Sequence, residues 1–453
     1  MTHHLRAGIL ALGLWACASP TPRGPSPSIG DVDSTPLPYA WLADFAAMQR
    51  LEELADLDWK NGAYSRAAAY FIAAAEHAQR VPSPTGDDLR ITAARALMRA
   101  GDADGALVQL RASVAAGFRN DRLIQTHEDF TRLRAHPALS AIVASAQTNS
   151  RAYAASHRRV EDVRLEFSDV ARFWAAYDLA AEVRGLSAKA RIFRRHYLGE
   201  GTAGLIDYYH LKTESSEALV AQLNATPGYY EGIRARTSSA EALAPQIRDG
   251  LRSLLELYPD AVVPDVTFVI GRLNSGGTAG PSGMLVGLDI WSWQEGIELD
   301  GISPGMQELL RSSSLEDLPF VVIHEHVHSL QVFAKEETLL DQALAEGSAD
   351  FLASLALPKA RKRYYHQWGL DHETEVWRDF QGEMDGVDAS RWIANLSTVE
   401  PGRSADLGYF VGARICEAYY AQAKDKAQAI RDILFVNDSK AFLKQSGYPQ
   451  RFH

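Results

Sequence analysis

LPFVVIHEHVHSLQVFAKEETLLDQALAEGSADF, residues 318–351, carries the strongest structural signal in this chain. Its first part has apolar residues at spacings of three and four, as on the buried face of a helix. Ser314 or Asp317 can cap this helix, and Pro319 is tolerated only in its first turn. The pattern therefore predicts a helix over about residues 318–330 that packs one face on the core.

The predicted helix contains the pattern H-E-x-x-H, formed by His324, Glu325 and His328. The two histidines are four positions apart, so their side chains lie on the same face of the helix. Two neutral imidazoles in this arrangement can bind one Zn²⁺ ion, and Glu325 can reach a water on the metal. His326 points away from that face, and we interpret it as solvated or locally hydrogen-bonded rather than as a ligand.

A catalytic zinc site needs three protein ligands, so a third ligand has to come from another segment. In the extended pattern H-E-x-x-H-x-x-G-x-x-H, the third ligand is a histidine that follows the second one in the same segment. Gln331 and Ala334 stand where the glycine and the last histidine of that pattern would be. That class of zinc protein is therefore excluded.

The next apolar-periodic segment, residues 339–357, is a second predicted helix with Thr338 and Asp341 as a capping box. It carries Glu346 and Asp350 one turn apart, so both carboxylates face the same way. A carboxylate ligand and a carboxylate that orients a histidine would suit a zinc site with two histidines and one glutamate. Small residues that let this helix approach the first one closely stand at positions 343, 347 and 349.

The H-E-x-x-H motif followed by E-x-x-x-D on the next helix resembles the gluzincin class of zinc metallopeptidases. Three segments, HEHVHSLQ, ALAEGSADF and DLGYFVGARICEAYY, are similar to a bacterial family of predicted zinc-dependent proteases. That family is known mainly as a domain of unknown function, and it is similar to a gliding-motility lipoprotein group. The resemblance covers roughly residues 160–453.

The resemblance implies a single Zn²⁺ ion with three protein ligands, His324, His328 and Glu346. It also implies Glu325 as the general base and Asp350 as the hydrogen-bond partner of His324. The spacing between the second histidine and the glutamate is at the short end for the class. Asp341 and Asp350 therefore stay open as alternative third ligands.

A later helix, expected to begin near Asp406, carries Tyr409 and Arg414 as its polar members. By the resemblance, Tyr409 is a catalytic residue whose hydroxyl would donate to the developing oxyanion. Arg414 could instead hold a carboxylate with two hydrogen bonds, either Asp350 or a substrate terminus.

Two strands are predicted at residues 266–270 and 284–290, with a glycine-rich loop at 274–280 between them. In gluzincins the sheet edge beside the metal binds the substrate as an added strand. We therefore expect residues 284–289 to lie near a bound peptide. The loop lacks the Gly-Lys-Ser/Thr sequence that a phosphate site of that kind requires.

Residues 39–150 are rich in alanine and predicted to be helical. A pattern that starts at Asn61-Gly62 recurs at Ala100-Gly101 and resembles part of a tetratricopeptide repeat, a stacked helical hairpin. The region would either support the second domain structurally or dock a protein partner. A domain boundary is expected near residues 147–160, where the pattern is broken at 147–150.

The N-terminus indicates export and lipid attachment. Residues 1–17 combine Arg6, a short apolar run and a sequence around Cys17 that resembles a bacterial lipobox. Residues 18–38 form a Pro/Ser-rich tether. A lipid on Cys17 would anchor the protein at the periplasmic face of the outer membrane, and Cys416 would have no cysteine to pair with.

Together these patterns predict a mainly α (α+β) protein. A signal peptide (1–17) and tether (18–38) precede a helical-repeat region (39–150) and a zincin-like metallopeptidase domain (160–453) with a small β-sheet. The length of 453 residues allows two or three domains, and the net charge of −11 argues against a nucleic-acid-binding surface.

The predicted function is hydrolysis of amide bonds in a peptide or protein substrate by a zinc-activated water, with Glu325 as general base. Two alternatives stay open. One is a non-catalytic envelope lipoprotein with a scaffolding role, and the other is a metallo-amidase that acts on peptidoglycan.

Overall fold

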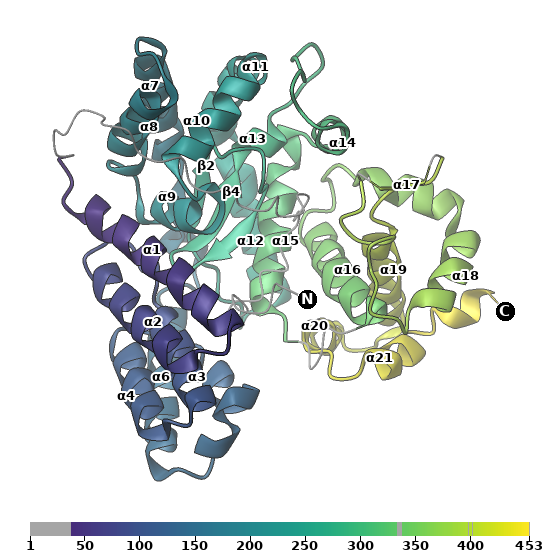
Figure 1. Ribbon diagram of the computed structural model, residues 1–453. Coiled ribbons are helices and arrows are strands. Elements are labelled where there is room, and N and C mark those ends of the chain that lie inside the picture. Colours follow the sequence, from purple (N-terminus) through teal and green to yellow (C-terminus); the bar gives the residue numbers. More distant parts are fainter. Residues whose placement is uncertain (1–37, 333–337, 397, 401, 453) are drawn as a thin grey trace.

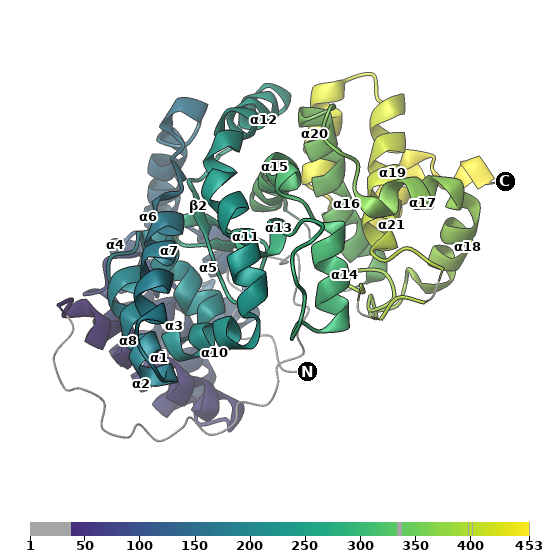
Figure 2. The same cartoon turned by 90° about the horizontal axis from the view of Figure 1, so that it is seen from above.

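The structure, a computed structural model, describes residues 38–332, 338–396, 398–400 and 402–452. It is mainly helical with one small four-stranded sheet, as the sequence predicts (Figure 1). Helices α1–α6 lie on one side of the molecule and α16–α21 on the other. The sheet, α12 and α15 lie between them in both views (Figures 1 and 2).

The N-terminal part consists of helical hairpins. Its elements are α1 (Trp41–Lys60), α2 (Tyr64–Ala78), α3 (Leu89–Ala100), α4 (Ala103–Ala115), α5 (Asp121–Thr126), η1 (Glu128–Leu133) and α6 (Pro137–Ala155). Gly62 and Gly101 make the two predicted turns with φ values of 73° and 87°, which glycine adopts without strain. Assignment of these hairpins to the tetratricopeptide repeats stays a prediction. Residues 147–150 do not interrupt the pattern, because α6 continues through them to Ala155.

Short helices surround the sheet. They are η2 (Val160–Asp162), α7 (Ser168–Ala181), α8 (Leu186–Phe193), η3 (Arg194–Leu198), α9 (Ala203–Tyr208), η4 (Tyr209–Thr213), α10 (Ser216–Ala225), α11 (Pro227–Ser239), η5 (Ala240–Leu243) and α12 (Ala244–Leu257). Of these, η3 and η4 are single π-helical turns.

The C-terminal half holds the helices that carry the predicted site. Its elements are α13 (Leu288–Trp291), α14 (Pro304–Ser312), η6 (Leu315–Asp317), α15 (Leu318–Leu330), α16 (Leu339–Ala356), α17 (Tyr364–Asp371), α18 (Glu373–Glu383), α19 (Leu407–Gln422), α20 (Lys426–Leu434), α21 (Ser439–Ser446) and η7 (Pro449–Phe452).

The sheet has the order β1-β2-β4-β3, formed by β1 (Leu165–Glu166), β2 (Val266–Val269), β3 (Thr278–Gly280) and β4 (Gly283–Gly287). Strands β1, β2 and β4 are parallel, and β3 runs antiparallel to β4. Both sides of β4 are thus occupied by other strands, so it has no free edge for a substrate. An added strand cannot pair with β4 itself, and the prediction that residues 284–289 lie near a bound peptide stays a prediction.

The second predicted strand is also too long. After β4 the chain turns into α13 at Leu288, and Asp289 explains why. Its carboxylate accepts hydrogen bonds from the backbone N–H groups of Gly271 and Leu273, at 2.8 and 2.7 Å. These bonds tie α13 to the loop after β2 and end the strand.

One helix organises the middle of the molecule. α15 packs against α12, α16, β3 and β4, and every residue from Leu318 to His328 is buried. The sequence predicts a single core-facing stripe, but the helix is enclosed on all sides. A side chain on any face of α15 is therefore held by neighbouring elements.

Residues 1–37, with the predicted signal peptide, Cys17 and nearly all of the predicted tether, lie outside the described residues. Among the described residues, none of the helices has both the length and the apolar character needed to span a bilayer.

Candidate metal centre

Local sequence fixes where α15 begins. Ser314 and Asp317 form a reciprocal capping box around η6, which runs directly into α15. Arg361 and Arg363 bind the carboxylate of Asp317, with nearest N–O distances of 2.6 and 3.3 Å. The start of the histidine-bearing helix is therefore held by both local and distant contacts.

The start of α16 is fixed in the same way, by a capping box of Thr338 and Asp341 as predicted. Gly347, one of its small residues, lies against a different helix from the one that the sequence suggests. A Cβ atom on Gly347 would lie 2.2 Å from the backbone nitrogen of Ala413 in α19. The glycine therefore admits α19 rather than α15, and this close approach brings α19 up to the site.

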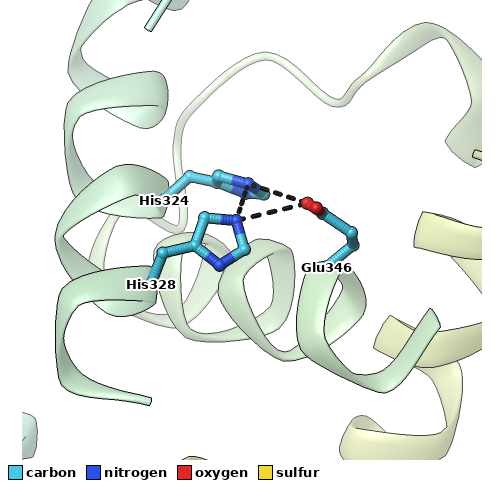
Figure 3. Close-up of side chains that lie close together, drawn as sticks. All are labelled: His324, His328 and Glu346. Atoms are coloured by element: carbon cyan, nitrogen blue, oxygen red, sulfur yellow. Dashed lines mark hydrogen bonds and ion pairs between the residues drawn. The ribbon is translucent and has the colours of Figure 1, made fainter. Parts of the chain in front are cut away.

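Three side chains from α15 and α16 converge on one point (Figure 3). Nε2 of His324 lies 2.9 Å from Nε2 of His328 and 3.4 Å from Oε2 of Glu346. Nε2 of His328 lies 3.2 Å from the same carboxylate oxygen. All three side chains are buried, with exposed fractions of 2%, 8% and 3%.

The other ring nitrogen of His324 is held by Asp350. Nδ1 of His324 lies 2.8 Å from Oδ1 of Asp350, and the Tyr365 hydroxyl donates to Oδ2 of the same carboxylate. A carboxylate only accepts hydrogen bonds, so Nδ1 carries the proton. Nε2 of His324 then presents its lone pair to the cluster.

Gln331 holds the second histidine in the same tautomer. Its Oε1 lies 2.8 Å from Nδ1 of His328. Its amide nitrogen donates to the carbonyl of Ala345 and to the hydroxyl of Ser348, at 2.6 and 2.7 Å. These bonds leave the oxygen facing the ring, so Nδ1 of His328 is the donor.

Both histidines therefore turn Nε2 toward the same carboxylate oxygen of Glu346. Three buried acceptor atoms that lie this close repel one another unless protons or a cation lie among them. Two imidazole nitrogens and one carboxylate oxygen are also the donor set of many catalytic zinc sites. The residues present fit a Zn²⁺ ion.

The pKa values of the three residues favour a positive charge, a proton or a cation, at this point. Burial alone would lower the pKa of His324, but hydrogen bonds to Asp350 and Glu346 outweigh it and raise the pKa to about 10. Burial would raise the pKa of Glu346, but the two histidines lower it to about 2. Glu346 also raises the pKa of His328 against the effect of burial.

Glu325 lies beside the cluster with its carboxylate against Gly277. It is 3% exposed, and its Oε1 has no hydrogen-bond partner among the described residues. A Cβ atom on Gly277 would lie 2.8 Å from this oxygen, so an alanine there would require the carboxylate to shift. Burial raises the pKa of Glu325, although the histidine charges oppose the shift.

Tyr409 reaches the centre from α19. Its ring stacks on that of His324, with centroids 6.2 Å apart. Burial, and next the charge of Glu346, raise the pKa of Tyr409 well above 10.0. Its hydroxyl therefore stays protonated and is able to donate a hydrogen bond.

Arg414, in contrast, has its ion-pair partners outside the cluster. Its Nε donates to Oε1 of Glu373 at 2.7 Å, and it also binds Glu417. Of the two alternatives for Arg414, a bond to Asp350 is not formed, because the side chain binds Glu373 on α18, and a bond to a substrate terminus stays a prediction.

Other candidates from the sequence have local partners. The ring nitrogens of His326 lie 2.6 Å from the carbonyl of Val322 and 3.1 Å from that of Pro264, so it is hydrogen-bonded locally but not solvated. The carboxylate of Asp341, an alternative third ligand, accepts hydrogen bonds from the backbone N–H and the hydroxyl of Thr338 in the cap of α16. Asp341 is therefore not one of the three residues that converge at the site.

Gln331 and Tyr365 are the residues that sequence reasoning missed. In the sequence, Gln331 stands out only because it replaces the glycine of the extended zinc pattern, although it directly follows α15. Tyr365 lies in an aromatic stretch in which the histidines at 366 and 372 draw attention first. A cavity of about 310 Å³ reaches Tyr365 and Asp350 but none of the three candidate ligands.

A family model described as gliding motility protein GldB matches residues 154–450. No curated protein and no solved structure matches the chain. The match includes α15, α16 and α19 with all the candidate site residues. It confirms the predicted similarity to a gliding-motility lipoprotein group and indicates a lipoprotein of the cell envelope.

Proposed function

The chain belongs to the gliding motility protein GldB family, and we propose that it is a zinc-dependent hydrolase of amide bonds in peptides or proteins. The observation that carries the proposal is the buried convergence of His324, His328 and Glu346. Structural zinc sites close their coordination with four protein ligands, whereas catalytic sites have three and keep one position open. Three ligands beside the uncommitted carboxylate of Glu325 match the catalytic kind.

Zinc bound by these residues would supply a Lewis acid that polarises the scissile carbonyl and makes water more acidic. Glu325 would take a proton from the attacking water and pass it to the leaving amine. Asp350 would keep His324 in the tautomer that offers Nε2. Tyr409 would donate a hydrogen bond to the oxygen that becomes negative.

A peptide substrate would add to the sheet at β3. Among the described strands it pairs with β4 alone, and it directly follows Gly277, which contacts Glu325. Binding along β3 would bring the backbone of an extended peptide past the general base. Lipid on Cys17 would hold the enzyme at the periplasmic face of the outer membrane, with the helical hairpins α1–α4 as a support or docking surface.

The test combines metal content with activity. We expect one zinc per chain in the wild type, none in Glu346→Ala, and full zinc content in Glu325→Gln. Cleavage of a peptide library by the zinc-loaded protein should be lost with a chelator. It should also fall by about 10²- to 10⁴-fold in Glu325→Gln, the usual contribution of a general base. Full activity in Glu325→Gln would exclude this mechanism.

A non-catalytic envelope lipoprotein with a scaffolding role is the second candidate. The family match favours it, because the description names motility and no reaction. Zinc-loaded protein that cleaves neither peptides nor purified sacculi would support this candidate. Cleavage of sacculi alone would instead support a metallo-amidase that acts on peptidoglycan.

A further inference from the structure

A short segment, residues 361–365, contacts all three helices of the metal centre. Its first part holds the start of α15, because Arg361 and Arg363 both bind Asp317. Arg363 is buried, and its guanidinium also lies over the ring of Trp291, 5.6 Å from the centroid. The segment is therefore firmly packed on one side of the centre.

Two neighbouring tyrosines form the second part of the segment, and each donates to a buried aspartate. Tyr364 donates to Asp406, which precedes α19, and Tyr365 donates to Asp350 on α16. Tyr365 is 4% exposed. Burial and the charge of Asp350 raise the pKa of Tyr365 well above 10.0, so its hydroxyl keeps the proton that it donates.

We propose that Tyr365 is a positioning residue of the metal centre, which orients Asp350 and through it the metal-binding nitrogen of His324. The inference rests on the proposed zinc site and adds a residue that acts on His324 through Asp350. Oδ1 of Asp350 faces Nδ1 of His324 at 2.8 Å, while Oδ2 accepts from Tyr365. The two bonds together fix the plane of the carboxylate.

Loss of the Tyr365 hydroxyl would leave one oxygen of a buried carboxylate without its donor. Such a group is costly, so the carboxylate would turn toward other donors and hold His324 less well. Loss of a partner behind a metal ligand usually weakens metal binding by 10- to 100-fold. Because Tyr365 acts through Asp350, we expect the lower end, about tenfold.

Tyr364 provides a matched control on the same segment. Its hydroxyl also donates to a buried aspartate, and Asp406 exchanges hydrogen bonds with Asn395 rather than with a metal ligand. Tyr364→Phe and Tyr365→Phe therefore each remove a hydroxyl that donates to a buried aspartate, from a half-buried and a buried side chain respectively. Only the second change touches the partner of His324.

The experiment measures the zinc affinity of the purified full chain by competition with a chromophoric chelator, together with thermal unfolding. We expect Tyr365→Phe to weaken zinc binding about tenfold, and Tyr364→Phe to stay within about twofold of wild type. In an Asp350→Ala background, Tyr365→Phe should cause no further loss, since its effect passes through that carboxylate. Substitution of Co²⁺ should also give a changed absorption spectrum for Tyr365→Phe only.

Equal losses of affinity in both tyrosine variants would assign Tyr365 a general structural role and overturn the inference. Unchanged affinity in Tyr365→Phe, while wild type binds zinc, would overturn it as well and leave the proposed function intact. Absence of zinc binding by the folded wild type would refute the metal site itself.

Discussion

Two glutamates only 21 positions apart, Glu325 and Glu346, have opposite environments in this structure. Histidines surround Glu346 and lower its pKa to about 2, so it is a permanent anion. Glu325 is buried against Gly277 with an unpartnered oxygen and a raised pKa. One carboxylate is therefore suited to hold a cation, and the other to exchange protons.

Zinc affinity should fall as the pH falls. The pKa of about 10 for His324 means that a proton occupies the cluster at neutral pH, and a zinc ion has to displace it. We expect the apparent Kd to rise at least about tenfold for each unit of decrease from about pH 9 to about pH 6. Competition titrations in a pH series measure this, and a flat profile would contradict the arrangement.

The same pKa sets how the metal-free protein depends on pH. Because the folded-state pKa of His324 is raised above its ordinary value of 6.5, its stabilising effect is complete below that value. The effect is lost as the pH rises toward about 10. Thermal unfolding of chelator-treated protein should therefore occur at lower temperature at pH 9 than at pH 6.5, and zinc should abolish this trend.

Gly277→Ala should disturb the general base but not the metal. The new methyl group would lie 2.8 Å from Oε1 of Glu325, in a site where that carboxylate is enclosed. Zinc content should stay at wild-type level, while the proposed hydrolysis falls by at least about tenfold. Gly382→Ala is the control, because nothing lies within 4 Å of its Cβ position on α18. Equal activity of both variants would show that Glu325 has more room than the structure gives it.

At the level of elements, helices were predictable where their signals are local. The capping boxes at Ser314 and Thr338 and the apolar periodicity fix the starts of α15 and α16 within the sequence itself. The second strand is shorter than the sequence predicts, because the hydrogen bonds that Asp289 accepts from distant backbone groups end it. The orientation of the histidines by Gln331 and Tyr365 likewise depends on tertiary contacts that spacing does not encode.

The packing of α16 on α19 should tolerate no side chain at Gly412. A Cβ atom there would lie 1.7 Å from the carbonyl oxygen of Ala343, a backbone atom that cannot turn away. Gly412→Ala should force the helices apart and destabilise the protein by at least about 1–3 kcal/mol. Denaturant unfolding measures this, with Gly382→Ala expected to be neutral or stabilising by up to about 1 kcal/mol. Unchanged stability of Gly412→Ala would contradict the close approach.

The whole molecule is connected by one large apolar core. Buried side chains of α1 and α2, such as Phe45 and Phe71, belong to the same cluster as those of α15, α16 and α19. A second, smaller cluster lies within α3–α6. The domain boundary expected from the sequence stays a prediction, but the described core does not separate there.

One route through this core leads from α1 to the site. The ring of Phe45 meets that of His210 on η4, with centroids 6.3 Å apart. The carbonyl of Lys212 on the same turn accepts from Asn274 at 2.8 Å, at the start of the loop that carries Gly277. A change in α1 therefore has a continuous path of contacts to Glu325.

Phe45→Ala should accordingly destabilise the metal centre together with the N-terminal helices. Removing a 3% exposed phenylalanine costs about 3–5 kcal/mol, and a shared core distributes that loss over the whole chain. In denaturant, loss of helical circular dichroism and release of bound Co²⁺ should shift together to lower concentration. Leu57→Ala on the same helix, where the side chain is 56% exposed, should shift neither by more than about 0.5 kcal/mol. If Phe45→Ala shifted the circular dichroism but left cobalt release unchanged, the N-terminal helices would unfold independently.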